Sequence, residues 1–261
     1  MQPTLFLSHG SPMLALQDIP ARQFLQDLGP ALDRPDAILV ISAHWETDVP
    51  AVNAVADNAT IHDFYGFPPA LYELAYPAPG APDLAARVAD LLGDAGLRAQ
   101  IDTARGLDHG AWVPLLLMWP EHDIPVLQLS VQSRLGPGHH VQLGRALAAL
   151  REQNILIVAS GSFTHNLRAL QRYNAGPEPE WVTQFADWMH EAIMAGRTCD
   201  LVSYRRLAPY AVENHPTDEH LLPLFVALGA AGGGEGTAPK ATRIHQSTDL
   251  GILRMDSYRF D

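Results

Sequence analysis

The sequence is poor in the residues that several large protein classes need. It contains one cysteine, Cys199, which excludes an intramolecular disulfide and a cysteine-rich metal site. Basic residues are scarce as well, because 17 Lys and Arg face 29 Asp and Glu, and the net charge of -12 opposes binding to nucleic acid. No apolar run approaches the roughly 20 residues that cross a bilayer, and no basic residue precedes the short apolar run near the start. We therefore expect an unexported, cytoplasmic protein without nucleic-acid or membrane partners.

Hydrophobic residues are abundant, and they are arranged in a pattern typical of α/β proteins. They make up 47% of the chain, which is enough for a sizeable core. Continuous apolar runs predict strands over residues 4–7, 37–42, 125–130 and 155–160. Helical patterns follow over residues 82–92, 111–119, 137–153, 179–195 and 217–230. We predict one α/β domain over residues 1–261, with a central, mostly parallel or mixed sheet covered by helices on both faces.

The last part of the chain carries three weaker signals. Thr217 or Asp218 can cap the helix predicted at 217–230, which would place His220 near its first turn. The glycine run at 232–236 lacks the Lys-Ser/Thr pair of a phosphate-binding loop, so we interpret it as a flexible connection. Residues 241–244 and 251–257 predict a pair of strands around a turn at 247–249.

Histidines follow the predicted strands at their carboxyl ends. His9, His44 and His165 come directly after or at the end of three predicted strands. Loops and helix starts gather at that edge of a parallel sheet, so these side chains and His220 can converge there. Neutral imidazoles bind zinc, iron, nickel or copper, so the pattern indicates a metal site built from nitrogen and oxygen ligands. A local hydrogen bond at each histidine explains the same residues, and the spacing contains no His-Glu-x-x-His motif.

Seven segments give the pattern a more specific meaning. They are SHGSP (8–12), SAHW (42–45), IHDFYGFP (61–68), YPAPG (76–80), LDHGAW (107–112), HNL (165–167) and PTDEHLLP (216–223). Taken together and in this order, they resemble the class III extradiol ring-cleavage dioxygenases, most closely the 4,5-DOPA dioxygenase branch. The resemblance extends from residue 8 to about residue 230.

The resemblance implies a non-haem metal site. Its protein ligands would be His9, His44 and His220, with one divalent metal that is Fe(II) for activity and zinc in the purified or resting protein. Neighbouring Glu219 is an alternative third ligand, because much of the wider superfamily binds its metal with two histidines and one carboxylate. His165 matches a position that is either a fourth ligand or the acid/base residue, and we favour the acid/base role during turnover.

The resemblance also implies a reaction. His109 matches a second catalytic histidine near the oxygen atoms of the reactants. The substrates would be a small, DOPA-like aromatic diol and O2, and the product a ring-opened semialdehyde acid. A metal lowers the pKa of the hydroxyls that bind it, and an imidazole such as His165 can take up the second proton.

Two other functions fit the same residues. A zinc hydrolase would use the same ligands to activate water, with His165 or Glu219 as the base. A non-catalytic relative would keep the fold and the metal but would have no need of the proton-transfer groups His109 and His165.

Residues around the expected site leave further alternatives. The aromatic residues of the 63–79 stretch can either wall a substrate pocket or pack a long surface loop; they are Phe64, Tyr65, Phe67, Tyr72 and Tyr76. His62 is either a polar group of the pocket or a loop hydrogen-bond partner. His215, held in extended backbone before Pro216, is a candidate supporting group. The sequence leaves the oligomeric state open.

Overall fold

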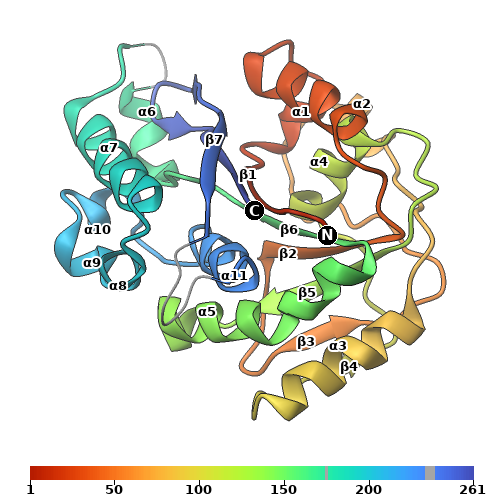
Figure 1. Ribbon diagram of the computed structural model, residues 1–261. Helices are drawn as coiled ribbons and strands as arrows, with labels where there is room; N and C mark the ends of the chain where they lie inside the picture. Colours follow the sequence, from red (N-terminus) through yellow and green to blue (C-terminus); the bar gives the residue numbers. More distant parts are fainter. Residues whose placement is uncertain (174–175, 233–238) are drawn as a thin grey trace.

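One mixed sheet forms the centre of the molecule. The computed structural model describes residues 1–173, 176–232 and 239–261. Within this part of the chain, eight strands join in the order β4-β3-β5-β2-β6-β1-β10-β7 (Figure 1). The strands are β1 Thr4–Ser8, β2 Ala37–Glu46, β3 Ala51–Asn53, β4 Gln100–Asp102, β5 Val126–Val131, β6 Ile155–Gly161, β7 Ala241–His245 and β10 Ser257–Phe260. The four strands β5, β2, β6 and β1 are parallel, so their carboxyl ends share one edge.

The outer strands make the sheet mixed. β10 pairs antiparallel with both β1 and β7, and β3 pairs antiparallel with β5. The four strands predicted from continuous apolar runs are all present. The prediction of a mostly parallel or mixed sheet within an α/β fold is therefore confirmed.

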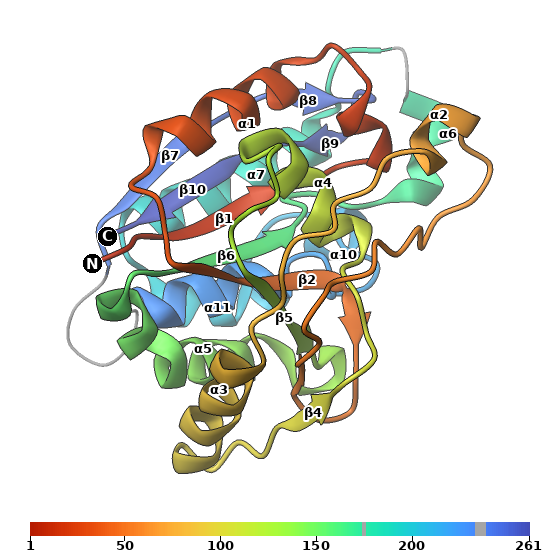
Figure 2. The same cartoon turned by 90° about the vertical axis from the view of Figure 1, so that its right-hand side faces the viewer.

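Helices cover both faces of the sheet, as predicted. Side chains of β2 alternate between two cores, with Leu39 and Ile41 on one face and Ile38 and Val40 on the other. Figures 1 and 2 show α1 and α4 on one side, and α3, α5 and α11 on the other. The longer helices are α1 Pro20–Ala31, α3 Pro82–Asp94, α4 His109–Met118, α5 Gly136–Leu147, α7 Glu180–Met194 and α11 Leu222–Ala230. Burial on both faces is the reason that the strand sequences read as unbroken apolar runs.

Two glycines allow α5 and α11 to pack closely. A Cβ atom at Gly144 would overlap the backbone oxygen of Val226, and one at Gly229 would overlap that of Val141. Every residue of α11 is buried, because the helix lies between the sheet and α5. This position explains why its sequence is apolar on all sides.

Some helix boundaries differ from the predicted ones. The helix predicted from residue 111 begins at His109, because the Asp108 side chain accepts a hydrogen bond from the Ala111 N–H and caps it. The helix predicted from residue 217 begins only at Leu222. Asp218 does not cap it, since its carboxylate accepts from the Tyr204 hydroxyl, 3.0 Å away, and from Arg205. His220 therefore lies just before the helix, near its first turn as expected, but outside it.

The predicted pairing near the end of the chain was also wrong in detail. β7 pairs with β10, whereas β8 Thr248–Asp249 and β9 Leu253–Arg254 form a separate small hairpin. The predicted strand at 251–257 is thus divided between β9, which belongs to the small hairpin, and the start of β10, which belongs to the main sheet. From residue 233 on, the glycine run interpreted as a connection lies outside the described residues. No helix in the described part of the chain is long and apolar enough to span a membrane.

Candidate metal centre and active-site pocket

Three of the histidines selected from the sequence converge at the carboxyl edge of the sheet. His9 follows β1, His44 lies near the end of β2, and His220 precedes α11. One ring nitrogen from each lies within 4.8 Å of the others. The Nε2 atoms of His9 and His44 are 3.0 Å apart. Parallel pairing of β1 and β2 with β6 between them brings the two strand ends to the same level.

The second ring nitrogen of two of these histidines is already hydrogen-bonded. His9 Nδ1 lies 2.9 Å from Ser160 Oγ, and that hydroxyl donates its own hydrogen to the Gly110 carbonyl. Ser160 must therefore accept from His9 Nδ1–H, which leaves a lone pair on His9 Nε2. His220 Nδ1 lies 3.0 Å from a carboxylate oxygen of Glu219, so its Nε2 also carries a lone pair.

These lone pairs fit a cation between the rings. His220 Nε2 is buried and has no hydrogen-bond partner among the described residues. Within the described part of the chain, the only hydrogen-bonding neighbour of His9 Nε2 is the facing Nε2 of His44. Buried polar atoms normally find partners, and a shared first-row metal ion would supply one for all three nitrogens.

Burial keeps these rings in the neutral form that binds metals. Desolvation lowers the pKa of His9 and of His220 well below the usual value. Desolvation likewise lowers the pKa of His44 to about 3, with a further contribution from His109. At neutral pH no proton has to leave the three rings before they coordinate an ion.

Asp63 links two of the histidines and was not selected from the sequence. Its Oδ1 accepts from the His109 N–H at 2.9 Å and lies 3.0 Å from His109 Nδ1, while its Oδ2 lies 3.7 Å from His44 Nδ1. Burial by itself would raise the pKa of Asp63, but the hydrogen bonds and charge of His109 lower it to about 2. A carboxylate behind a ligand histidine fixes the ring and its tautomer. The signal available in the sequence was an acidic residue inside the IHDFYGFP segment.

His109 and His165 lie beside different members of this group. The ring of His109 is 3.9 Å from that of His44, between ring centres. His165 stacks on His220 with ring centres 3.4 Å apart and planes 13° from parallel. Desolvation lowers the pKa of His165 to about 4, so its ring is unprotonated at neutral pH. All five histidines selected from the sequence are thus brought together.

A buried carboxylate supports the backbone on which His44 and His109 sit. Asp108 is fully buried and accepts from Ser42 Oγ at 2.6 Å, from Arg105 at 3.0 Å and from Gln128. Ser42 Oγ in turn accepts from the His44 N–H at 3.2 Å. Because Asp108 also caps the helix that begins at His109, one side chain fixes the positions of both histidines.

A cavity of about 380 Å³ opens beside the histidines. Among the described residues, its polar side comprises Gly10, Ser11, His44, His109, His165 and His220. The other lining residues are apolar and are called the apolar wall below: Pro12, Phe64, Phe67, Leu167, Leu170, Leu250 and Leu253. A cavity of this size and composition is suited to a small aromatic molecule.

The aromatic loop contributes only part of the expected lining. Phe64 and Phe67 reach the cavity, as one of the two interpretations predicts. Tyr76 is fully buried in the core, and Tyr65 is 92% exposed. Tyr72 is outside the described lining, although its ring lies 5.2 Å from that of Phe64.

Two further histidines stabilise loops. His62 Nε2 lies 3.0 Å from the backbone oxygen of Leu74, which favours the loop role over the pocket role. His215 Nε2 lies 3.0 Å from the backbone oxygen of Phe163, next to the segment that carries His165. His215 is therefore placed behind the site, as expected of a supporting group.

Comparison with known proteins agrees with this geometry. Residues 3–250 match the family model described as the catalytic LigB subunit of aromatic ring-opening dioxygenase. A Beta vulgaris protein named 4,5-DOPA dioxygenase extradiol is 48% identical, covering 98% of this chain and 96% of that protein. An Escherichia coli protein of the same name is 44% identical, covering 89% and 86% respectively. The crystal structure of an uncharacterized Escherichia coli K12 protein superposes with a TM-score of 0.82 at 36% identity, covering all of both chains.

Proposed function

We propose that this chain, a member of the LigB family of aromatic ring-opening dioxygenases, is an Fe(II)-dependent extradiol enzyme. Its reaction would open the ring of a catechol with O2. Bond cleavage would occur beside the two hydroxyl groups and give a semialdehyde acid. Relatives named 4,5-DOPA dioxygenase extradiol support a DOPA-like diol as the substrate class. We further propose that residues 1–261 act as one catalytic unit.

The observation that carries the proposal is the convergence of three imidazole nitrogens. His9, His44 and His220 would hold the metal through Nε2, with Glu219 bonded to His220 Nδ1 and acting behind the ligand. A bound Fe(II) ion would make the catechol hydroxyls more acidic and allow electrons to pass between the catechol and O2. Zinc fits the same nitrogen ligands and would occupy them when iron is lost.

His165 is the proposed acid/base residue. Its ring is neutral and borders the cavity, so it can accept the proton of the second catechol hydroxyl and return a proton to the opened ring. The His165 ring stacks on the face of the His220 ring, so it lies beside the proposed ligands. The edge of the His220 ring, which carries Nε2, is left for the metal.

His109 is proposed to orient the reacting oxygen atoms. The Asp63 carboxylate faces its Nδ1 at 3.0 Å, so the neutral ring carries a lone pair on Nε2 that can accept a hydrogen bond from a catechol hydroxyl. The ring lies in the cavity lining and contacts Phe64 of the apolar wall, with ring centres 5.7 Å apart. Apolar walls exclude water from the oxygen atoms, which strengthens such hydrogen bonds.

A direct test uses protein freed of metal with a chelator and reconstituted anaerobically with Fe(II). Addition of O2 and a catechol panel should give a yellow ring-opened product with one O2 consumed for each catechol. Zinc-loaded protein should give none. If no catechol is opened by iron-loaded protein, or if esters and amides are hydrolysed by zinc-loaded protein without O2, the proposal is wrong.

The roles of the histidines can be separated with variants. His165→Ala should retain one metal per chain, measured by elemental analysis, but lose turnover by about 100-fold or more. His220→Ala should lose both the metal and the activity. His139→Ala is the matched control, because His139 lies away from the site and contacts Gln132. Full turnover by His165→Ala would show that His165 is not the acid/base residue.

A further inference from the structure

We infer that Thr164 is a positioning residue of the proposed reaction, an inference that rests on the proposed function. Its side chain ties the loop that carries His165 to the β8–β9 hairpin, residues 248–254, which borders the same cavity. Thr164 is outside the described lining of the cavity, so it acts through His165 and not on the substrate. One hydroxyl thus connects the proposed acid/base residue with an element that faces the substrate.

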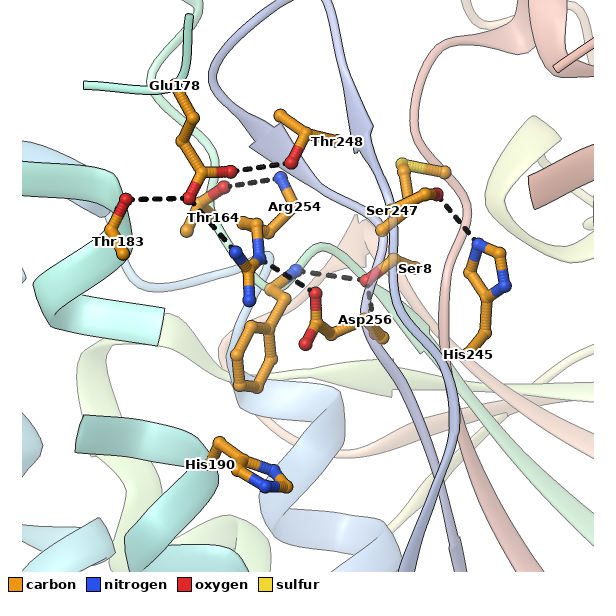
Figure 3. Close-up of polar contacts among 12 residues, drawn as sticks. Ser8, Thr164, Glu178, Thr183, His190, His245, Ser247, Thr248, Arg254 and Asp256 are labelled. Carbon is orange, nitrogen blue, oxygen red and sulfur yellow. Dashed lines mark hydrogen bonds and ion pairs between the residues drawn. The ribbon is translucent and has the colours of Figure 1, made fainter. Parts of the chain in front are cut away.

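The Thr164 hydroxyl is buried and makes two hydrogen bonds to the hairpin. It donates to the backbone oxygen of Ile252 at 2.7 Å. It accepts from the backbone N–H of Arg254 at 2.8 Å (Figure 3). A hydroxyl can donate once and accept as well, so both of these roles are filled from the hairpin. The two bonds fix the residue that directly precedes His165 in the chain.

The position of the His165 ring depends on the backbone of this loop. Within the site, the ring stacks on His220 with ring centres 3.4 Å apart. A proton can pass only between atoms within hydrogen-bonding reach, and a displacement of about 1 Å can slow a reaction about 100-fold. The contacts of the preceding residue therefore bear on the rate of the proposed proton transfer.

A second tie holds the start of the same loop independently of Thr164. The Ser8 hydroxyl donates to the backbone oxygen of Asp256 at 2.8 Å (Figure 3). It also accepts from the Phe163 N–H at 3.1 Å. Phe163 thus keeps its anchor when the Thr164 hydroxyl is removed. The effect of a Thr164 substitution should therefore be confined to the part of the loop next to His165.

The hairpin can serve as a support because Arg254 anchors it. With two paired residues in each strand, the hairpin would be marginal by itself. The buried Arg254 donates from Nε to Asp256 and from Nη1 to Glu178, both at 2.9 Å (Figure 3). Glu178 also accepts from the Thr248 hydroxyl at 2.5 Å, so one carboxylate holds both strands of the hairpin (Figure 3).

The same hairpin supplies part of the apolar wall. Leu250 and Leu253 line the cavity, and Leu250 does so from a turn in which its φ is +47°. A positive φ is uncommon for a bulky residue, so the turn conformation is imposed by its surroundings. The hairpin keeps the Arg254 anchor without the Thr164 hydroxyl. The wall, and with it the affinity for substrate, should therefore survive a Thr164 substitution that slows turnover.

A pair of variants at Thr164 tests the inference. Thr164→Val removes both hydrogen bonds and keeps the shape of the side chain. In Fe(II)-loaded protein, we expect kcat for the catechol opened fastest to fall about 10- to 100-fold, with KM changed less than about threefold. The metal content, measured by elemental analysis, should equal that of the unsubstituted protein. Thr164→Ser keeps the donor and the acceptor, so it should retain at least about a third of kcat.

Thr4→Val is the matched control. Thr4 is a buried threonine at the end of β1 away from His9, and its hydroxyl donates to the backbone oxygen of Ala227 at 2.9 Å. This variant should retain kcat even where its thermal unfolding temperature is lowered. A loss of kcat in Thr4→Val as large as in Thr164→Val would show that any lost buried hydrogen bond has this effect, and the inference would be wrong.

Hydrogen exchange gives a readout that does not depend on turnover. The His165 N–H donates to the backbone oxygen of Asn214 at 2.9 Å, so its exchange reports the order of the loop. In zinc-loaded Thr164→Val, the peptide covering residues 162–166 should exchange about tenfold faster or more, measured by mass spectrometry. The same peptide should exchange at the unsubstituted rate in Thr164→Ser and in Thr4→Val. An unchanged rate in Thr164→Val would overturn the inference.

Failure of the inference and failure of the proposed function give different results. If the unsubstituted protein opens no catechol, the proposed function is wrong, and the exchange data still decide whether Thr164 orders the loop. If the unsubstituted protein is active, the inference is wrong when Thr164→Val keeps its kcat or when Thr164→Ser fails to restore it. Loss of metal together with kcat in Thr164→Val would show that the hydroxyl supports the ligands instead, which also overturns the inference.

Discussion

The Nε2 atoms of His9 and His44 face each other at 3.0 Å, although 35 positions separate the two residues in the chain. Ser160 Oγ accepts a hydrogen bond from His9 Nδ1–H on the opposite side of the ring, so the facing nitrogen of His9 carries a lone pair. Two such nitrogens together with His220 Nε2 form a binding site for a cation. Several consequences of this arrangement can be measured.

Ser160→Ala should weaken metal binding. The substitution removes the acceptor for His9 Nδ1–H, so the ring loses both its fixed tautomer and its orientation. Loss of such a supporting hydrogen bond typically lowers metal affinity about 10- to 100-fold. Competition with a coloured chelator measures the Kd. Ser133→Ala is the control, because the Ser133 hydroxyl donates to Glu46 and not to a proposed ligand. An unchanged Kd for Ser160→Ala would show that the hydroxyl does not set the tautomer.

Asp63→Asn should reduce turnover more than metal content. The amide lacks the charge that now faces His44 Nδ1 and His109 Nδ1, so both rings lose a partner. We expect kcat to fall about 10- to 100-fold while most of the metal is retained, because no ligand is removed. Steady-state O2 uptake and elemental analysis on the same sample test this. Full activity, or loss of all metal, would contradict the proposed position of Asp63 behind the site.

Gly110→Ala should displace a proposed ligand without unfolding the chain. The added Cβ would overlap Ser42 Oγ and approach His44 Cδ2 to 3.0 Å. We expect metal affinity to fall at least tenfold, since ligand geometry tolerates only small displacements. Gly93→Ala is the control, because nothing lies within 4 Å of a Cβ at that helical position. Equal affinities for the two variants would mean that His44 adjusts freely.

His140→Gln should flatten the dependence of stability on pH. Desolvation lowers the pKa of His140 to about 4, and its ring bonds to Gln132 N–H and Gly136 O. Because the unfolded chain takes up this proton near pH 6.5, the contribution is complete above that pH and is lost as the pH falls towards 4.

The size of the effect follows from the shift in pKa. The loss between pH 7 and pH 4 amounts to about 3 kcal/mol at most for His140, at about 1.4 kcal/mol for each pKa unit. Urea unfolding of metal-free protein at several pH values measures the free energy of unfolding. The variant should lose less stability than the unsubstituted chain over this interval. If the free energies of unfolding of the two proteins change with pH in parallel, the pKa of His140 is not lowered by folding.

The supporting residues show where sequence reasoning reached its limit. His9, His44 and His165 were found because each follows an apolar run, and strand ends are visible in the sequence. Ser160 also lies at such an end and Asp108 lies just before α4, but serines and aspartates are frequent at both kinds of place and nothing in the chain marks their partners. Asp63 lies in a loop whose path no periodic pattern describes. Its contacts with His44 and His109 could be found only from the folded loop.

The sequence by itself determined the α/β class, the four parallel strands and the histidines at their carboxyl ends. Strands buried on both faces are continuous apolar runs, and such runs can be identified from neighbouring residues alone. Tertiary structure decided which ring nitrogens face one another, where α4 and α11 begin, and which hydrophobic side chains wall the cavity. The physical reason is that a tautomer and a cavity depend on partners such as Ser160 and Leu253, which are distant in the chain and brought into contact by folding. The start of α11 likewise depends on Asp218, whose carboxylate is occupied by the Tyr204 hydroxyl.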